Sequence, residues 1–330
     1  MLELTKAVLA LLIGFLFALI LGVLLIPYLK KIKANQSLSI YLSRTHEKKV
    51  GTPTMGGFIF IGSTIGTFLL LLFFHRIAFS YHLGIVLLTF LSYSFIGFLD
   101  DYLIILRHNN KGLTETSKLL LQIIIAIAFF YLFMMAGNES LIWIHALHIK
   151  WNIGWFYGLF ILFVLVASSN AVNLTDGLDG LAGGLSLIAF GTFGIISYAT
   201  GWLEGYEEIA LFCFVLVGAL LGFLVFNTSP AKIFMGDTGS LALGATLGAI
   251  AILTRHELLL ILVGIVFVVE TMTCIIQRVY YKFTKKRFFP MTPIHHTFEK
   301  WGWEERDIVR LFWIIGAIAS MIAIIYGVWI

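Results

Sequence analysis

The chain has 330 residues, of which 60% are hydrophobic and only 12% are charged, about half the charged fraction of a typical soluble domain. This composition excludes a soluble globular protein. The long unbroken apolar blocks also exclude a transmembrane β-barrel, whose strands alternate apolar and polar residues. The net charge of +4 reflects basic loops that contact anionic lipid, so nucleic-acid binding is not expected. We expect an all-α integral membrane protein with a single domain over residues 1–330.

Ten apolar stretches approach the length of about 20 residues that a membrane-spanning helix needs. They lie at Ala7–Tyr28, Met55–Phe74, Tyr81–Leu99, Leu119–Ala136, Trp155–Ser169, Leu181–Thr200, Ile209–Phe226, Leu241–Leu253, Leu258–Tyr281 and Ile308–Trp329. The first stretch is too long for the apolar part of a signal peptide, and no small-residue cleavage site follows it. We therefore predict an uncleaved first helix and ten transmembrane helices.

Lysine and arginine are distributed unequally between alternate loops. One set of loops has only Lys6, Arg76, Lys150 and Arg255, and the rest of the 22 basic residues lie in the other set. Loops rich in basic residues remain in the cytoplasm. Ten helices then place both termini outside and the basic loops in the cytoplasm.

The aspartates indicate where the functional surface lies. Five of the six follow three of the apolar stretches on the predicted cytoplasmic face: Asp100, Asp101, Asp176, Asp179 and Asp237. Capping of helix N-termini explains single aspartates, but Asp100 and Asp101 follow a predicted helix, where the helix dipole disfavours an acid. A divalent cation or bound basic side chains would balance the charge of the set.

Two polar turns contain three of these aspartates. Their sequences are SSNAVNLTDGLDGL at residues 168–181 and NTSPAKIFMGDTGS at residues 227–240. Short polar side chains with glycines favour tight turns whose backbone N–H groups can bind an anion. Phe234 is an aromatic residue on the second turn, and anchoring at the membrane interface is an alternative explanation for it.

Two basic segments complete the predicted cytoplasmic surface: HEKKVGTPTMGG at residues 46–57 and PMTPIHHTFE at residues 290–299. Adjacent histidines do not share a helix face, and neither Cys213 nor Cys274 lies near enough to complete a zinc site, so phosphate recognition fits better than metal binding. An acidic cleft that holds Mg²⁺ among basic residues indicates phosphoryl transfer between a nucleotide compound and a lipid. A transporter is the main alternative, because Glu270 lies within the ninth apolar stretch.

Five motifs resemble those of a known family. GTPTMGG (51–57), DDY (100–102), NAVNLTDGLDGLA (170–182), FMGDTGS (234–240) and PIHH (293–296) are similar to motifs of the phospho-N-acetylmuramoyl-pentapeptide-transferases. That family belongs to the polyprenyl-phosphate N-acetylhexosamine-1-phosphate transferase superfamily. The resemblance implies a multi-pass enzyme of the bacterial cell membrane with a cytoplasmic active-site cleft. A homodimer would be compatible with the small residues Gly244, Ala245 and Gly248, which allow close helix packing.

The resemblance also implies a reaction. Phospho-MurNAc-pentapeptide would pass from UDP-MurNAc-pentapeptide to undecaprenyl phosphate with Mg²⁺ as cofactor, which forms lipid I for peptidoglycan synthesis and releases UMP. A sister enzyme that uses another UDP-N-acetylhexosamine is the alternative. The sequence PIHH-x-FE-x-x-GW, which ends at Trp303, favours the muramyl-pentapeptide reaction.

Individual roles follow from the same resemblance. Asp100, Asp101 and Asp237 would be catalytic, and Asp237 would also bind Mg²⁺. Phe234 would stack on the uracil ring, with Lys49 and Asp179 near it. The full set of implied substrate-binding residues is Lys49, Thr54, Lys118, Asn173, Asp176, Asp179, Phe234, Gln277, His295 and His296.

The chain departs from the family pattern at three places. Ile104 stands where the family's DDxxK motif has its lysine, and Thr297 stands where the family has a third consecutive histidine. The segment LSRTH at residues 42–46 also differs from the glycine-proline segment usual in the family. The missing lysine removes a positive charge near Asp101, for which Arg107 and Lys111 are candidate substitutes.

Overall fold

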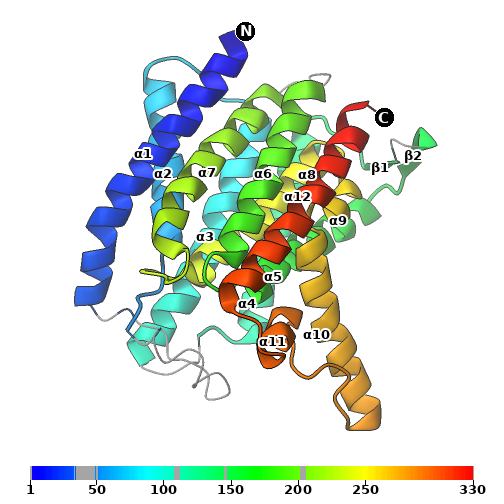
Figure 1. Cartoon of the computed structure of the whole chain (residues 1–330). Helices are drawn as coiled ribbons and strands as arrows, with labels where there is room; N and C mark the ends of the chain where they lie inside the picture. The colour runs from blue at the N-terminus through cyan, green and yellow to red at the C-terminus, as the bar shows by residue number, and fades with distance from the viewer. Residues whose placement is uncertain are drawn as a thin grey trace.

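The computed structural model describes residues 2–32, 34, 49, 51–107, 112–144, 147–200 and 206–329. Within these residues the chain forms twelve helices and one antiparallel pair of short strands. The helices make a single bundle, and both termini lie at the same end of it (Figure 1). The predicted all-α fold is therefore confirmed except for this strand pair.

The elements follow one another in this order: α1 (Leu2–Lys31), α2 (Gly57–Phe73), α3 (Tyr81–Arg107), α4 (Glu115–Met135), β1 (Leu141–Ile144), β2 (Ile149–Asn152), α5 (Phe156–Thr175), α6 (Leu181–Thr200), α7 (Tyr206–Asn227), α8 (Gly236–Leu253), α9 (Leu259–Val263), α10 (Ile265–Thr284), α11 (Ile294–Lys300) and α12 (Glu305–Trp329).

Eight helices in the described part are long and apolar enough to cross a membrane: α1, α3, α4, α5, α6, α7, α8 and α12. Each corresponds to one of the ten predicted stretches. The second stretch forms α2, which is apolar but has only 17 residues. The ninth stretch is divided at Gly264 into α9 and α10, and α10 extends away from the bundle (Figure 1). Glycine weakens a helix interior by about 1 kcal/mol relative to alanine, which favours a break at this position.

The β-hairpin between α4 and α5 was not predicted. Its strands pair with Leu141 opposite Asn152 and Ile144 opposite Ile149. β-Branched and aromatic residues favour these short strands, but the strong apolar helices on either side obscure so brief a pattern. Leu141 is buried against the bundle, whereas β2 is exposed along its whole length.

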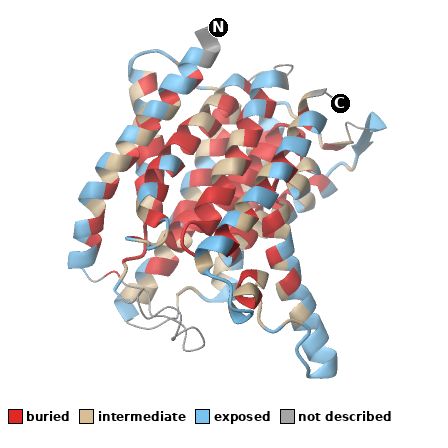
Figure 2. Cartoon of the chain, viewed as in Figure 1, coloured by how far each residue is buried: buried red, intermediate tan, exposed pale blue. Residues whose placement is uncertain are grey.

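Buried residues gather in the middle of the bundle (Figure 2), and helix α8 belongs to this core. All its residues are buried except Asp237 in its first turn, and it packs against α3 and α5. A Cβ atom at Gly244 would overlap the carbonyl oxygen of Ser168 on α5, and one at Gly248 would lie 2.6 Å from the Ser168 hydroxyl oxygen. The small residues of α8 therefore pack inside the chain and are not available for close packing against a second subunit.

Close contact between α3 and α8 positions the polar end of the bundle. A Cβ atom at Gly97 would overlap the carbonyl oxygen of Asp237. Gly97, Asp100 and Asp101 share one helix face, since residues three and four apart are neighbours on a helix. Helix α3 continues to Arg107, so the prediction that the two aspartates follow the helix is wrong.

A similar difference occurs at the end of α5. This helix continues to Thr175, six residues beyond the predicted boundary at Ser169. Asn173 therefore lies on a helix and not in the predicted turn. The turn itself begins at Asp176 and leads directly into α6.

Candidate active site

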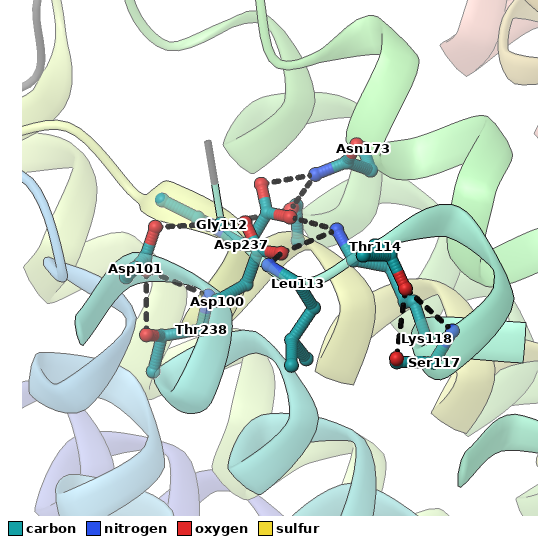
Figure 3. A network of polar contacts seen from close by, with 12 residues as sticks. Asp100, Asp101, Gly112, Leu113, Thr114, Ser117, Lys118, Asn173, Asp237 and Thr238 are labelled. Atoms are coloured by element: carbon teal, nitrogen blue, oxygen red, sulfur yellow. Dashed lines mark hydrogen bonds and ion pairs between the residues drawn. The ribbon is translucent and has the colours of Figure 1, made fainter. Parts of the chain in front are cut away.

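A lysine lies between two aspartates that come from different helices (Figure 3). The Nζ atom of Lys118 is 3.1 Å from Asp100 Oδ1 and 2.7 Å from Asp237 Oδ2. Lys118 occupies the first turn of α4, where the hydroxyl of Thr114 caps the helix by accepting a hydrogen bond from Ser117 N at 3.1 Å. The cap at Thr114 places Lys118 near the start of α4, and the packing of α3, α4 and α8 brings the three charges together.

Asp101 caps the N-terminus of α8 from the neighbouring helix α3. Its Oδ1 accepts a hydrogen bond from Asp237 N at 3.2 Å. Its Oδ2 accepts from the backbone N and the hydroxyl of Thr238 at 3.0 and 2.7 Å. The positive end of the helix dipole stabilises a carboxylate at this position. Asp101 therefore holds the backbone that presents the Asp237 side chain.

Asn173 engages the other oxygen of the same carboxylate. Its Nδ2 donates to Asp237 Oδ1 at 2.8 Å and to Ser240 Oγ at 2.9 Å. Asp237 is thus oriented by an amide from α5 and an ammonium from α4. The Asp237 side chain is 22% exposed and that of Asp100 is 7% exposed, so Asp237 is the more accessible to a ligand. We call Asp100, Asp101, Asp237, Lys118 and Asn173 the acidic cluster.

Gly236 allows the segment before α2 to approach this cluster. Its φ angle is +73°, a backbone conformation that favours glycine. A Cβ atom here would lie 2.5 Å from Asp101 Oδ2 and 2.6 Å from Thr54 Oγ1. The predicted substrate-binding residue Thr54 is therefore next to the acidic cluster.

Backbone hydrogen bonds join the segments that precede α2 and α8. Phe234 N donates to Pro53 O at 2.8 Å, and Gly56 N donates back to Phe234 O at 2.8 Å. Gly57 N continues the pairing by donating to Met235 O at 2.9 Å. This pairing fixes the position of Phe234 without using its ring, which leaves the ring half-buried at the surface.

A second charged group lies beside Phe234. Lys49 Nζ is 2.7 Å from both Asp179 Oδ1 and Glu305 Oε1, and it is 6.0 Å from the centroid of the Phe234 ring. Glu305 Oε1 also accepts a hydrogen bond from Asp179 N at 2.6 Å. The three residues that the resemblance assigned to the uracil are thus neighbours. We call Lys49, Asp179, Phe234 and Glu305 the Lys49 cluster.

Glu305 was missed by the sequence analysis. It lies in the first turn of α12, where acidic residues are common because they stabilise the helix dipole. Its local sequence therefore gives no sign of a site. Only the fold, which brings α12 next to the turn at Asp179, identifies it.

Asp176 interacts electrostatically with residues of both clusters. Burial, followed by the negative charges of Asp237, Asp101 and Asp179, raises the pKa of Asp176 to about 7, and Lys49 opposes the rise. Carboxylates that raise one another's pKa values favour the binding of a cation. The site therefore has an excess of negative charge that its two lysines do not balance.

The two predicted histidines belong to α11, which borders the turn that contains Asp176. His295 Nδ1 is 3.1 Å from Glu270 Oε1, and both side chains are fully buried. A Cβ atom at Gly177 would overlap His295 Nε2, so α11 packs against the turn that contains Asp176. Glu270, which suggested a transporter, thus pairs with a histidine close to the acidic cluster.

His296 and Gln277 each have a hydrogen-bond partner near them in the sequence. His296 Nδ1 is 2.6 Å from Glu299 Oε2 within α11. Gln277 Oε1 accepts hydrogen bonds from Phe288 N and Phe289 N at 3.0 and 2.9 Å. Gln277 therefore holds the segment after α10 in place, and in the described part no hydrogen bond joins it to the aspartates.

The ammonium beside Asp100 comes from another helix and not from residue 104. Ile104 is half-buried on α3, and Lys118 supplies the ammonium beside Asp100. Arg107 Nη1 donates to the carbonyl oxygen of Gly112 at 3.2 Å. Lys111, the other candidate substitute, lies outside the described residues.

The acidic cluster is compatible with a divalent cation. No three His, Cys, Asp or Glu side chains of the described residues are arranged to hold a metal ion by themselves. Two carboxylates, however, already converge on the single cation of Lys118. Mg²⁺ in phosphoryl-transfer sites is held by one or two carboxylates and completed by substrate phosphates and water. Asp237 and Asp100 provide such a partial set of oxygen ligands.

The chain is similar to one protein family and to several enzymes that share one name. Residues 83–255, which contain the acidic cluster, match glycosyl transferase family 4. The chain is 46% identical over 318 residues to the phospho-N-acetylmuramoyl-pentapeptide-transferase of Bacillus mycoides (strain KBAB4), with 96% of each chain covered. It is also 46% identical over 321 residues to the enzymes of the same name from Bacillus thuringiensis (strain Al Hakam) and Bacillus anthracis (strain A0248), again with 96% coverage.

Proposed function

The chain belongs to the phospho-N-acetylmuramoyl-pentapeptide-transferase family, and from this membership we propose its substrates and the roles of its site residues. It transfers phospho-MurNAc-pentapeptide from UDP-MurNAc-pentapeptide to undecaprenyl phosphate. The products are lipid I, an intermediate of peptidoglycan synthesis, and UMP. The main support from the structure is the convergence of Asp100, Asp237 and Lys118 on one point, which suits a pyrophosphate and its counter-ion.

The proposed setting is a bacterial cell membrane crossed ten times. Helix α2 and the interrupted pair α9–α10 would be the second and ninth crossings, with both termini outside. The presence of both termini at one end of the bundle supports an even number of crossings (Figure 1). The positive-inside rule then places the acidic cluster at the cytoplasmic face, where a UDP-linked donor is available.

In the reaction, an oxygen of the lipid phosphate attacks the phosphorus that bears the sugar. A new P–O bond forms while the P–O bond to UMP breaks, and UMP leaves with the electron pair. The attacking oxygen is already ionised, so no strong base is needed. Lys118 would pair with the negative charge around the reacting phosphates, and Asp100 would hold Lys118 in place.

Asp237 would be the main ligand of Mg²⁺, with Asp100 beside it. When bound, Mg²⁺ neutralises charge on the pyrophosphate and on the departing UMP. Asn173 orients the Asp237 carboxylate, and Asp101 fixes its backbone. Asp101 would therefore act as a positioning residue for Asp237.

The Lys49 cluster would bind the nucleoside end of the donor. Phe234 offers a half-buried ring for stacking on uracil, and Lys49 and Asp179 offer polar groups at its edge. Thr54 would close the same side of the site. His295 and His296 would lie toward the sugar, since α11 packs against the turn at Gly177.

A direct assay tests this reaction. The purified protein in detergent is given undecaprenyl phosphate and Mg²⁺ with either UDP-MurNAc-pentapeptide or UDP-GlcNAc, and UMP release is measured. We expect UMP only from the first donor and only when the lipid is present. Release from UDP-GlcNAc alone would identify the sister activity, and release from neither donor would reject the proposal.

A further inference from the structure

A cavity of about 680 Å³ lies between α10, the segment that connects α10 to α11, and the last residues of α5. Its lining is partly apolar, with residues such as Leu174 and Phe289. Leu174 follows Asn173, which donates a hydrogen bond to Asp237. The cavity therefore adjoins the acidic cluster but is lined by different residues. We call it the basic cavity.

Three cationic side chains make the basic cavity positively charged. Arg278, Arg287 and Lys300 all line it, and among the described residues no acidic side chain does. Arg287 Nη1 and Lys300 Nζ both donate to the carbonyl oxygen of Pro290, at 3.0 and 3.3 Å. Arg278 makes no hydrogen bond or ion pair with another described residue. The cavity thus offers unneutralised positive charge to an anion.

The wall of this cavity is built by specific contacts. Gln277 Oε1 accepts the backbone N–H groups of Phe288 and Phe289 and folds the connecting segment back onto α10. Thr297 Oγ1 donates to Met291 O at 2.5 Å and accepts from Met291 N at 3.4 Å. Thr297 is the residue that replaces the family's third histidine. Its hydroxyl therefore helps to shape the cavity wall.

We propose that the basic cavity binds the peptide part of the donor substrate through its carboxylate groups. This inference rests on the proposed function, in which the donor is a UDP-linked sugar with a pentapeptide. The sugar is covalently joined to both the phosphate and the peptide, so a peptide site must adjoin the acidic cluster. A peptide ends in a carboxylate, and arginine binds carboxylates with two parallel hydrogen bonds.

A lipid phosphate is also an anion with an apolar part, so the experiments have to distinguish a bound lipid phosphate from a bound peptide. Two of the three cations, Arg287 and Lys300, lie on the exposed connecting segment and on the seven-residue helix α11. Neither belongs to a helix long enough to cross a membrane. This position favours an aqueous peptide over a lipid headgroup.

A native cysteine can report whether a ligand occupies the basic cavity. Cys274 lines the basic cavity and is partly exposed, whereas Cys213 is fully buried in α7. A maleimide should therefore label Cys274, and Cys274→Ser should abolish the labelling. We expect UDP-MurNAc-pentapeptide at ten times its Kd, without lipid acceptor, to slow labelling by about tenfold. UDP-MurNAc without the peptide should leave the rate unchanged.

Two outcomes of the labelling experiment would overturn the proposal. One is equal protection by UDP-MurNAc without its peptide, which would mean that the nucleotide sugar alone covers the cavity. The other is protection by undecaprenyl phosphate and not by the pentapeptide donor. Protection by the donor without UMP release in the transfer assay would reject the proposed reaction but retain the peptide site.

A matched pair of variants on α10 tests the charge. Arg278→Gln removes a cation of the cavity, and Lys282→Gln removes one from the same exposed helix outside the cavity. We expect Arg278→Gln to raise the KM for UDP-MurNAc-pentapeptide by about tenfold, as for the loss of one charge-assisted hydrogen bond. Its kcat and its KM for undecaprenyl phosphate should stay at the values of Lys282→Gln. An increase confined to the lipid KM would overturn the proposal.

Discussion

The two ends of the bundle contain buried polar groups that differ in charge balance. At the end where α8 begins, the acidic cluster lies beside Asp176 and the Lys49 cluster. At the end where α8 finishes, Arg255 Nη1 donates to Tyr157 Oη at 3.4 Å and to Leu141 O at 3.2 Å. The Tyr157 hydroxyl donates to Glu257 Oε1. We call Arg255, Tyr157 and Glu257 the Arg255 network.

The comparison distinguishes a structural network from a reactive site. The Arg255 network has one cation and one carboxylate, and it joins β1 to α5 and to the end of α8. The acidic cluster, the Lys49 cluster and Asp176 together have six carboxylates and two lysines: Asp100, Asp101, Asp176, Asp179, Asp237 and Glu305, with Lys49 and Lys118. Buried polar groups alone therefore do not indicate function, whereas an unbalanced charge that is partly exposed requires a ligand.

The largest effect is expected at the acidic cluster. Asp237→Asn keeps the size of the side chain but removes the charge that would hold Mg²⁺. We expect kcat for UMP release to fall by about 10²–10³-fold, the range found when one electrostatic group of an active site is removed. The thermal midpoint in detergent should change little. Turnover close to that of the unmodified protein at limiting Mg²⁺ would contradict the assignment.

Removal of the carboxylate charge from the Arg255 network, by Glu257→Gln, should affect stability and not catalysis. Burial raises the pKa of Glu257 from 4.5 to about 7. The folded protein thus keeps this proton to higher pH than the unfolded chain does, so ionisation of Glu257 lowers stability as pH rises from about 4.5 to above 7. The loss is about 3 kcal/mol when complete.

Glu257→Gln removes this ionisation and retains an acceptor for Tyr157. We expect its thermal midpoint to fall less between pH 5 and pH 8 than that of the unmodified protein, with kcat and KM unchanged. Thermal unfolding at several pH values and the UMP assay measure the two effects. Parallel pH profiles of the two proteins, or a large loss of turnover, would show that the two ends do not differ as we infer.

A smaller effect is expected at the Lys49 cluster. Phe234→Ala removes the ring proposed to stack on uracil, which should cost about 1–3 kcal/mol of donor binding, a roughly 5- to 150-fold increase in KM. Phe95→Ala is the control, because Phe95 is an exposed apolar residue of α3. An unchanged KM together with a lower thermal midpoint would instead identify Phe234 as a membrane-interface anchor.

Much of the fold could be predicted because the relevant signals are local. Length and hydropathy alone identified the eight helices that are able to cross a membrane. The break at Gly264 was missed because a single glycine does not interrupt the hydropathy of the ninth stretch. The short strand at Leu141 was missed because the apolar helices on either side obscure its pattern. The ends of α3 and α5 were also placed too early, because polar residues inside a helix look like the start of a loop.

The site residues could be named from motifs, but their arrangement could not. Asp101 caps α8 from another helix, and this depends on the close contact at Gly97. Lys118 pairs with aspartates that are far from it in the sequence. Glu305 has no local signal at all. These contacts form only when α3, α4, α8 and α12 pack together.

The smallest effect concerns Ile104, where the family pattern has a lysine. Ile104 is three residues after Asp101 and four after Asp100, so a lysine here would lie on the same helix face as these acids. The new ammonium would supply part of the charge neutralisation that we assign to Mg²⁺. Lys118 already pairs with Asp100, however, so the gain should be only that of one helical ion pair, about 0.2–0.5 kcal/mol.

Ile104→Lys should therefore lower the Mg²⁺ concentration that gives half-maximal rate by about 1.4- to 2.3-fold. Ile104→Met is the control, because it provides a long flexible side chain without charge. Rates measured against Mg²⁺ concentration for the three proteins decide the question. Superimposable curves would mean that residue 104 faces away from the acids. A higher Mg²⁺ requirement in the lysine variant would mean that a second ammonium competes with the metal, so that Lys118 alone already supplies all the positive charge that the acidic cluster accepts from the protein.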